Sequence, residues 1–248
     1  MKRYKIIMGM TITVDIADAH VTEEIFETIF SYFTYVDETF STYKDTSEIS
    51  KINKGLIDSQ GYSPDMREVF ILSEETKKKT NGYFDIKTPQ GKYDPSGLVK
   101  GWAIYNAAKI LLEKGFSRFY IDAGGDIQTS GTNEHGEIWS VGIRSPFKPE
   151  TEVIKVLSIK DKGVATSGTY VRGNHIYNPH SKKPTDNEIV SLTVVGPNVY
   201  EADRFATAAF AMGKKGIMFI ENLDGFEGYS IDKNGIATMT THFNSYIK

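Results

Sequence analysis

The chain has 248 residues, no cysteine and a formal net charge of −3 at pH 7, with 29 Lys and Arg against 32 Asp and Glu. Its 40% hydrophobic and 25% charged residues are typical of a globular protein with a large core, and they exclude a disordered chain or a fibre. The charge balance argues against nucleic-acid binding, because a phosphate backbone needs clustered Lys and Arg. The absence of cysteine excludes disulfides, thiolate metal sites and a cysteine nucleophile.

The first 16 residues, MKRYKIIMGMTITVDI, predict a strand from residue 4 to residue 16, because apolar and polar residues alternate there. They contain no apolar run of signal-peptide length followed by a small-residue cleavage site, and no segment of the chain approaches the length of a membrane span. We therefore expect a cytoplasmic protein with no membrane span. A processed or trimmed exported form that begins here would have the same sequence.

Helices are expected mainly in the first half of the chain. Apolar residues at helical spacing predict a helix over Val21–Phe40, and Ser47 opens a short helical turn. A helix is predicted within Ser63–Gly82, where the Ser-Pro start and the Asn-Gly stop are typical boundary signals. Another helix runs from about Leu98 to Lys114 and is closed by Gly115.

Strands are expected to dominate the second half, in FYIDAGGDIQTSG, EIWSVGI, VIKVLSI, GVATSG and Ile189–Val195. A helix follows GPN, another is predicted in KKGIMFIEN, and GYSID with GIATMT predicts a terminal hairpin. Because strands come in consecutive blocks without regular strand-helix alternation, the pattern favours an α+β fold with mainly antiparallel sheets and flanking helices. We expect two lobes that share one cleft, within a single domain over residues 1–248 or as two intimately joined halves.

Asp203 and Thr207 stand four residues apart in EADRFATAAFAMG, so on a helix their side chains share one face. In one interpretation, Asp203 caps the helix start and Thr207 bonds back to a carbonyl of the preceding turn. In the other, the carboxylate and the hydroxyl hold a hard cation such as Mg²⁺. These residues alone leave both interpretations open.

Glycine-rich turns raise the question of nucleotide binding, but neither GxGxxG nor GxxxxGK[ST] occurs in the chain. Gly124–Gly125 is either a tight turn or a place where backbone amides approach a ligand. In GVATSGTYVRGNHIYNP, the hydroxyls of Thr166 and Ser167 could contact a phosphate, with Arg172 near. A hydrolase built on Ser167 and His175 is weakly supported, because the sequence has no GxSxG elbow and indicates no acidic partner.

GYFDIK and KYDPSGLVKG supply Asp85, Asp94 and Lys100, each of which could be a turn residue or a surface ion-pair member. The Asp-Pro-Ser-Gly sequence before a helix can turn backbone oxygens and amides toward a cleft. Lys100 is expected in the first turn of that helix, where the dipole disfavours a cation unless an anion lies nearby. Four histidines lie in predicted loops or chain ends and are assigned no role: His20, His135, His180 and His242.

Taken in chain order, these segments resemble the ApbE family of FAD:protein FMN transferases, once described as thiamine-biosynthesis lipoproteins. The matching segments are Met8-Gly9, FSTYKDTSEISKIN, GYFDIK, YDPSGLVKGWA, IDAGGDIQTSG, VATSGTYVR, HIYNP and ADRFATAAFAMG, between about residues 8 and 213. The resemblance implies an ApbE-like, T-fold-like arrangement with the substrate FAD in the cleft between the lobes and Mg²⁺ at its pyrophosphate. It also implies transfer of FMN to a Thr or Ser hydroxyl of an acceptor protein, with release of AMP.

The resemblance also assigns residues to the site. The Mg²⁺ ligands would be the side chains of Asp203 and Thr207 and the backbone oxygen of Gly97, and Mn²⁺ would suit the same oxygen-only site. Lys100 would stabilise charge, and His175 would be the base that accepts the hydroxyl proton. The residues expected around the flavin or its nucleotide are Met8, Tyr43, Asn53, Tyr83, Phe84, Asp85, Asp94, Lys100, Gly124, Gly125, Asp126, Thr166, Ser167, His175 and Ile176.

The chain departs from the family pattern at three places. Tyr105 and Asn178 stand where Asp is expected, and His180–Lys182 replaces Arg-Thr-Gly. These changes bear on the local turn and on acceptor preference. The lipoprotein start of exported members is missing, in line with the expected cytoplasmic location. Two alternatives keep an FAD site: a pyrophosphatase that uses water and yields FMN and AMP, and a non-catalytic FAD-binding protein.

Overall fold

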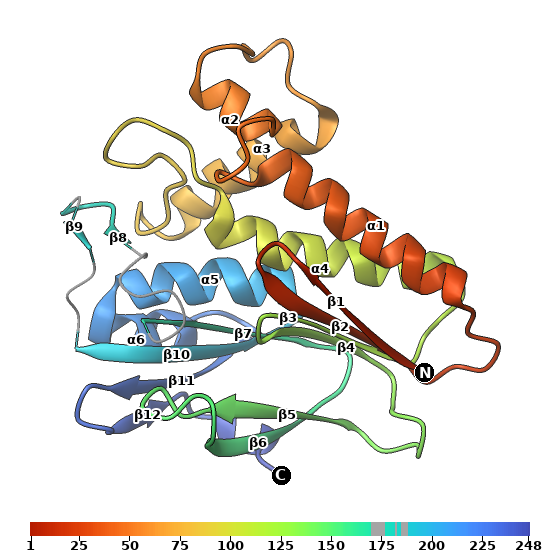
Figure 1. The fold of residues 1–248 in the computed structure, drawn as a ribbon. Helices are drawn as coiled ribbons and strands as arrows, with labels where there is room; N and C mark the ends of the chain where they lie inside the picture. The colour runs from red at the N-terminus through yellow and green to blue at the C-terminus, as the bar shows by residue number, and fades with distance from the viewer. Residues whose placement is uncertain (170–176, 182, 185–187) are drawn as a thin grey trace.

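A computed structural model describes residues 1–169, 177–181, 183–184 and 188–248. An eight-stranded antiparallel sheet forms its centre, in the order β1-β2-β3-β4-β7-β10-β11-β12 (Figure 1). These strands are β1 (Lys2–Ile7), β2 (Met10–Ile16), β3 (Phe119–Ala123), β4 (Asp126–Ser130), β7 (Gly163–Gly168), β10 (Ile189–Gly196), β11 (Glu227–Asp232) and β12 (Ala237–Met239). Two short pairs stand apart from it: β5 (Trp139–Arg144) with β6 (Val153–Ile159), and β8 (Tyr177–Asn178) with β9 (Lys183–Pro184).

The helices gather on one face of this sheet, and the β5–β6 hairpin lies on the other (Figure 1). Helix α5 packs against β7 and β10 as well as against α4, and α4 in turn packs against α1. The helices are α1 (Glu23–Phe40), α2 (Glu48–Asn53), α3 (Pro64–Lys79), α4 (Ser96–Glu113), α5 (Val199–Ala211) and α6 (Gly216–Glu221), with short 3₁₀ turns η1 (Gly213–Lys215) and η2 (Phe243–Tyr246). Within the described ranges, each helix is too short or too polar to cross a membrane.

Side-chain caps explain where the helices start. The hydroxyls of Ser47 and Ser63 accept the N–H groups of Ser50 and Met66, and the Asn198 amide oxygen caps α5 in the same way. The predicted starts of α2, α3 and α5 are therefore confirmed. The terminal hairpin is also present as β11–β12, although η2 follows it.

Three hydrophobic clusters fill the space around the sheet. One lies among α1 to α4, β2 and β3, and a second lies under α5 and α6 against β10. The third fills the space between the sheet, the β5–β6 hairpin and η2. The predicted class, helices with mainly antiparallel sheets, is confirmed. The division into two lobes with a ligand cleft between them stays a prediction, as does the single domain over residues 1–248.

The predicted single strand over residues 4 to 16 is wrong, because the chain turns back at Met8-Gly9 to form the β1–β2 hairpin. Met8 and Gly9 both have positive φ, 57° and 70°, as a two-residue hairpin turn requires. Glycine adopts this conformation easily, whereas methionine rarely does. Apolar residues continue through the turn, so the sequence pattern does not reveal it.

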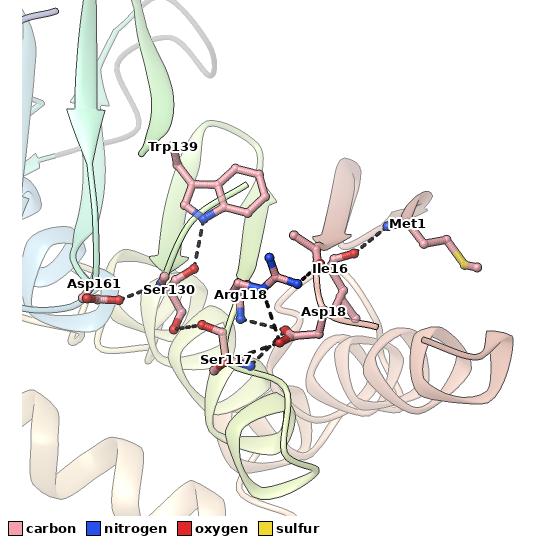
Figure 2. Close-up of polar contacts among 10 residues, drawn as sticks. Met1, Ile16, Asp18, Ser117, Arg118, Ser130, Trp139 and Asp161 are labelled. Carbon is pink, nitrogen blue, oxygen red and sulfur yellow. Dashed lines mark hydrogen bonds and ion pairs between the residues drawn. The ribbon is translucent and has the colours of Figure 1, made fainter. Parts of the chain in front are cut away.

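One end of the sheet is held by a set of polar contacts around Asp18 (Figure 2). The Asp18 carboxylate accepts the backbone N–H groups of Ser117 and Arg118, at 3.0 and 2.7 Å. The Ser130 hydroxyl donates to the Ser117 carbonyl, and the Trp139 indole donates to the Ser130 carbonyl. Strand β3 begins at this end and finishes at the opposite one, where Ala123 pairs with Asp126. The residues described next lie at that opposite end.

Candidate functional site

Helix α5 carries Asp203 and Thr207 toward α4. Because Asn198 is the N-cap, Asp203 lies one turn inside the helix and does not cap it. Its carboxylate is 4% exposed and accepts the N–H of Gly101, at 2.8 Å. The Thr207 hydroxyl donates to the Gly97 carbonyl, at 3.3 Å, rather than to a carbonyl of its own helix. The interpretation of these residues as a cap and a local back-bond is therefore wrong.

Two glycines allow this close approach of α4 and α5. A Cβ placed on Gly101 would lie 2.6 Å from the Cβ of Asp203 and 2.8 Å from the Val199 carbonyl oxygen. A Cβ on Gly97 would lie 3.1 Å from Cγ2 of Thr207. Gly97 and Gly101 are four residues apart and so share a face of α4. A larger residue at Gly101 would move Asp203 away from the start of α4.

Asp126 stands at the first position of β4 and brings Lys100 into the same region. Its carboxylate is 1% exposed, and its Oδ2 lies 2.7 Å from Nζ of Lys100. Its Oδ1 accepts the N–H of Thr166 on β7, at 3.1 Å. The expected anion beside Lys100 is therefore present. Lys100 itself is the fifth residue of α4, so it lies in the second turn rather than in the predicted first turn.

Strand β7 contributes one hydroxyl group and one backbone N–H. The Ser167 and Thr207 hydroxyl oxygens are 3.5 Å apart, and the N–H of Thr166 donates to Asp126. The Thr166 hydroxyl points to the other face of the sheet, because successive strand residues alternate, and pairs there with that of Thr193 on β10, at 2.9 Å. Side chains and backbone groups from α4, α5, β4 and β7 thus meet at one place. We call this set the polar cluster: Gly97, Lys100, Gly101, Asp126, Thr166, Ser167, Asp203 and Thr207.

The electrostatics of the polar cluster are set by two neighbouring carboxyl groups. Burial raises the pKa of the Asp203 carboxyl well above its usual range, and the charge of Asp126 raises it further. Lys100 and the N–H of Gly101 act in the opposite direction. Two carboxyl groups therefore accompany one ammonium group among the polar-cluster residues, an arrangement that a bound cation would stabilise.

The oxygen atoms of the polar cluster fit a hard divalent cation. Asp203 offers a carboxylate, Thr207 a hydroxyl and Gly97 a backbone carbonyl, which is the type of donor that Mg²⁺ prefers. The described residues contain no group of three or more His, Cys, Asp or Glu side chains suited to a metal. A site with one carboxylate is nevertheless typical of Mg²⁺ bound together with substrate phosphates and water. The predicted metal ligands are thus brought together, and their role stays a prediction.

Asn53 and Asp94 act on the backbone that leads into α4. The Asn53 amide donates to the Tyr93 carbonyl and accepts the Tyr93 N–H, at 2.8 and 2.7 Å. The Asp94 carboxylate accepts the N–H of Ser96, the first residue of α4. Both contacts fix the start of α4, and with it Gly97 and Lys100. These two side chains therefore support the polar cluster from outside.

The segment after α3 lies against the start of α4. Phe84 is buried, and its Cε2 lies 3.5 Å from a Cβ placed on Gly97. Asp85 accepts the N–H of Lys87 and pairs with Lys77, at 2.7 Å. Tyr43 is 96% exposed in the connection between α1 and α2, so the structure does not pack it against the polar cluster.

The Gly124–Gly125 pair forms the tight turn between β3 and β4. Both residues have positive φ, 62° and 95°, and their N–H groups donate to the Thr11 carbonyl and the Asp122 carboxylate. The turn interpretation is confirmed, since both amides already have partners within the protein. The β1–β2 turn containing Met8 lies at the same end of the sheet, because β2 begins where β3 finishes.

Part of the predicted site lies outside the described residues, namely His175, Ile176 and the neighbouring Arg172. The sequence prediction also missed Arg204, whose guanidinium is buried within α5. It pairs with Glu201 through two nitrogens and donates to the Thr76 hydroxyl of α3, at 2.9 Å. The sequence did contain a signal for this contact: Arg204 stands in a helix of small apolar residues, three residues after Glu201. Arg204 anchors α5 to α3 next to Asp203.

The fold is that of known ApbE proteins. Over 100% of this chain and 99% of the other, it matches an ApbE protein from Thermotoga maritima with a TM-score of 0.89 and 20% identity. It matches the flavin transferase ApbE from Vibrio cholerae with a TM-score of 0.83 and 21% identity, over 99% of both chains. These similarities define the fold.

The ApbE family profile matches residues 8–90 and 87–230, so the chain belongs to the ApbE family. Among its relatives, the FAD:protein FMN transferase of Escherichia coli K12 is 27% identical over 219 residues, which cover 77% of this chain and 62% of the relative. The FAD:protein FMN transferase of Vibrio cholerae O395 is 25% identical over 238 residues, covering 80% and 71%. The chain thus matches a little over three fifths of the E. coli relative's length.

Proposed function

We propose that this protein is a Mg²⁺-dependent FAD:protein FMN transferase. It would move FMN from FAD to a Thr or Ser hydroxyl of an acceptor protein and release AMP. Membership in the ApbE family and the names of the relatives support this proposal. The observation that carries it is the polar cluster, where Asp203, Thr207 and the Gly97 carbonyl meet beside Lys100.

In the proposed reaction the acceptor hydroxyl oxygen forms a bond to the phosphorus of the FMN portion. The bond between that phosphorus and the bridging oxygen breaks, AMP leaves with the bridging oxygen, and the hydroxyl proton passes to a base. Bound Mg²⁺ would neutralise pyrophosphate charge, which is where much of the catalysis of phosphoryl transfer comes from. Asp203, Thr207 and the Gly97 carbonyl would hold it.

The other residues of the polar cluster have supporting tasks. Lys100 is held by Asp126, so its ammonium group is oriented before any phosphate arrives. A preorganised cation stabilises developing negative charge without reorganisation during the reaction. Asp126 also accepts the Thr166 N–H, which fixes β7 and its Ser167 hydroxyl relative to α5.

The test is intact-mass spectrometry of an acceptor that carries a Thr in a short loop rich in Gly, Ala and Ser, after incubation with the protein, FAD and Mg²⁺. AMP release is followed in the same reaction. The controls are EDTA, Asp203→Ala, and Asp224→Ala as a matched exposed aspartate. We expect a mass gain equal to FMN that EDTA and Asp203→Ala abolish and Asp224→Ala preserves.

The other outcomes identify the alternatives. AMP release without labelling of several such acceptors would favour an FAD pyrophosphatase that uses water. Tight FAD binding with neither product would leave a non-catalytic FAD-binding protein.

A further inference from the structure

The β8–β9 hairpin contacts two parts of the protein that are distant in the sequence. Its turn includes Asn178, His180 and Ser181, and it lies beside the segment that follows α3 (Figure 1). On one side, the Asn178 amide donates to the carbonyl of Ala211 in α5, at 3.4 Å. The Asn178 amide oxygen also accepts the N–H groups of His180 and Ser181, at 2.9 and 3.4 Å. This residue therefore fixes both the turn and its attachment to α5.

On the other side, His180 contacts the end of α3. Its Nε2 lies 3.0 Å from the carbonyl oxygen of Asn81, so this nitrogen carries the proton and donates it. The imidazole meets the Tyr83 ring edge to face, with the ring centroids 4.4 Å apart. Gly82, between Asn81 and Tyr83 in the chain, has a φ of +80°, and a Cβ placed on it would lie 3.5 Å from the imidazole. Three consecutive residues, 81 to 83, thus face the ring.

Together, these contacts form a closed ring of neighbouring residues that includes Gly97 and Thr207 of the polar cluster. Tyr83 is followed by the buried Phe84, which lies against Gly97. The Gly97 carbonyl accepts from Thr207, and Ala211 lies one helical turn beyond Thr207 on α5. From Ala211 the contacts return through Asn178 and His180 to the segment 81–84. This ring of contacts depends on His180, because its side chain makes the contacts to both Asn81 and Tyr83.

We propose that His180 is a positioning residue of this enzyme. It fixes the segment 81–84 relative to α5 and thereby sets the distance between the Gly97 carbonyl and the Thr207 hydroxyl. These are two of the groups that would bind the metal ion of FAD. The identity of the ligand in this inference rests on the proposed function. The coupling between the segment 81–84 and α5 does not depend on it. The inference also gives a task to a position at which this chain departs from the family pattern.

The activity test compares His180→Ala with the wild-type protein. The change removes one hydrogen bond and one aromatic contact that hold the segment 81–84, so the KM for FAD should rise about tenfold. The value of kcat should change by less than about threefold, since the residue does not touch the reacting atoms. His180→Gln retains a donor for Asn81 but lacks the ring, so it should restore part of the affinity. His135→Ala, an exposed histidine in the β4–β5 connection at the other end of the sheet, is the matched control.

A second measurement does not depend on activity. In the ligand-free protein, His180→Ala should speed hydrogen exchange of the amides in residues 80–97, including Asp94, whose N–H donates to the Ile86 carbonyl. His135→Ala should leave this exchange unchanged. Faster exchange in a protein that neither transfers FMN nor releases AMP would support the coupling and overturn the proposed function. Unchanged exchange and an FAD KM within twofold of wild type would overturn the role of His180. A fall in kcat and thermal stability with unchanged KM would also overturn it.

Discussion

Asp203 places a carboxyl group where the surroundings oppose its charge. It is almost completely buried, its backbone donor is Gly101, and another carboxyl group, Asp126, is its neighbour. Taking such a charge out of water is costly unless a cation or several donors compensate for it. The proposed metal ion would supply that compensation.

This argument predicts the behaviour of Asp203→Asn, which keeps the shape and can still accept the Gly101 N–H. The variant should melt at the same or a higher temperature than the wild type without Mg²⁺, because a neutral amide replaces a carboxyl group whose charged form burial and Asp126 disfavour. It should lose the stabilisation that Mg²⁺ with FAD gives to the wild type, and transfer should fall at least about 100-fold. Thermal melts with and without ligand, together with the rate of FMN transfer, check both parts. A variant that kept the ligand-induced stabilisation would show that Asp203 is not a metal ligand.

His175 lies outside the described residues, so its proposed role rests on the sequence. An imidazole titrates near neutral pH and can accept the acceptor's hydroxyl proton. His175→Ala should therefore slow transfer about 100-fold, within the usual range for loss of a general base. The measurement is the transfer rate from pH 6 to pH 9. Wild-type rates over that range would end the assignment.

Sequence alone placed Asp203 and Thr207 on one face of a helix, since four-residue spacing fixes that. Spacing could not identify their partners, which precede them by about a hundred positions and contribute only backbone groups. The family resemblance supplied Gly97, and Gly101 was missed. Backbone donors and acceptors leave no residue-specific signal in a sequence. His180 and Arg204 were missed for a related reason, since their contacts are made across the fold.

At the scale of elements, the close packing of α4 on α5 controls the site. The two helices meet where α4 has glycines facing Asp203 and Thr207. Caps and apolar spacing allowed α1, α3 and α4 to be predicted within about two residues. The β1–β2 turn was missed because Met8 is an unusual residue for positive φ, so no local signal marked it.

The contact between these helices predicts the effect of Gly101→Ala. The added methyl group would overlap the Cβ of Asp203 and the Val199 carbonyl, so α5 must shift. Overpacking of this kind should lower the free energy of unfolding by about 2 kcal/mol and should also slow FMN transfer. Urea denaturation and the transfer assay measure the two effects. Glu113→Ala, at the exposed end of α4, should change neither.

At the scale of the whole molecule, the Asp18 contacts and the polar cluster lie at opposite ends of the sheet. The contacts of Asp18 with Ser117 and Arg118 are made where β3 begins (Figure 2), and Asp126 of the polar cluster stands where β3 finishes. The strand order could not be predicted, because β4 lies next to β7 and β7 next to β10, and local patterns do not encode such pairings.

This separation predicts that Asp18→Ala affects stability alone. Two backbone N–H groups lose their acceptor, which should lower the free energy of unfolding by about 1–2 kcal/mol. The KM for FAD should remain within about twofold of wild type, because the contacts of Asp18 among the described residues are with Ser117 and Arg118, at the end of the sheet away from the polar cluster. Denaturation and steady-state kinetics on one preparation decide the matter. A tenfold rise in KM would mean that the two ends of the sheet are coupled.

The residues of the polar cluster lie between positions 97 and 207, so the cluster cannot form until late in the synthesis of the chain. A ribosome-bound chain must release α5 before Asp203 and Thr207 can meet α4, and by then all strands from β1 to β10 have been made. A chain that ends before α5 therefore lacks the assembled polar cluster, where FAD would bind under the proposed function. Under the proposed function, FAD binding by a growing chain would accordingly report that translation has passed α5 and that the strands up to β10 are available to pair.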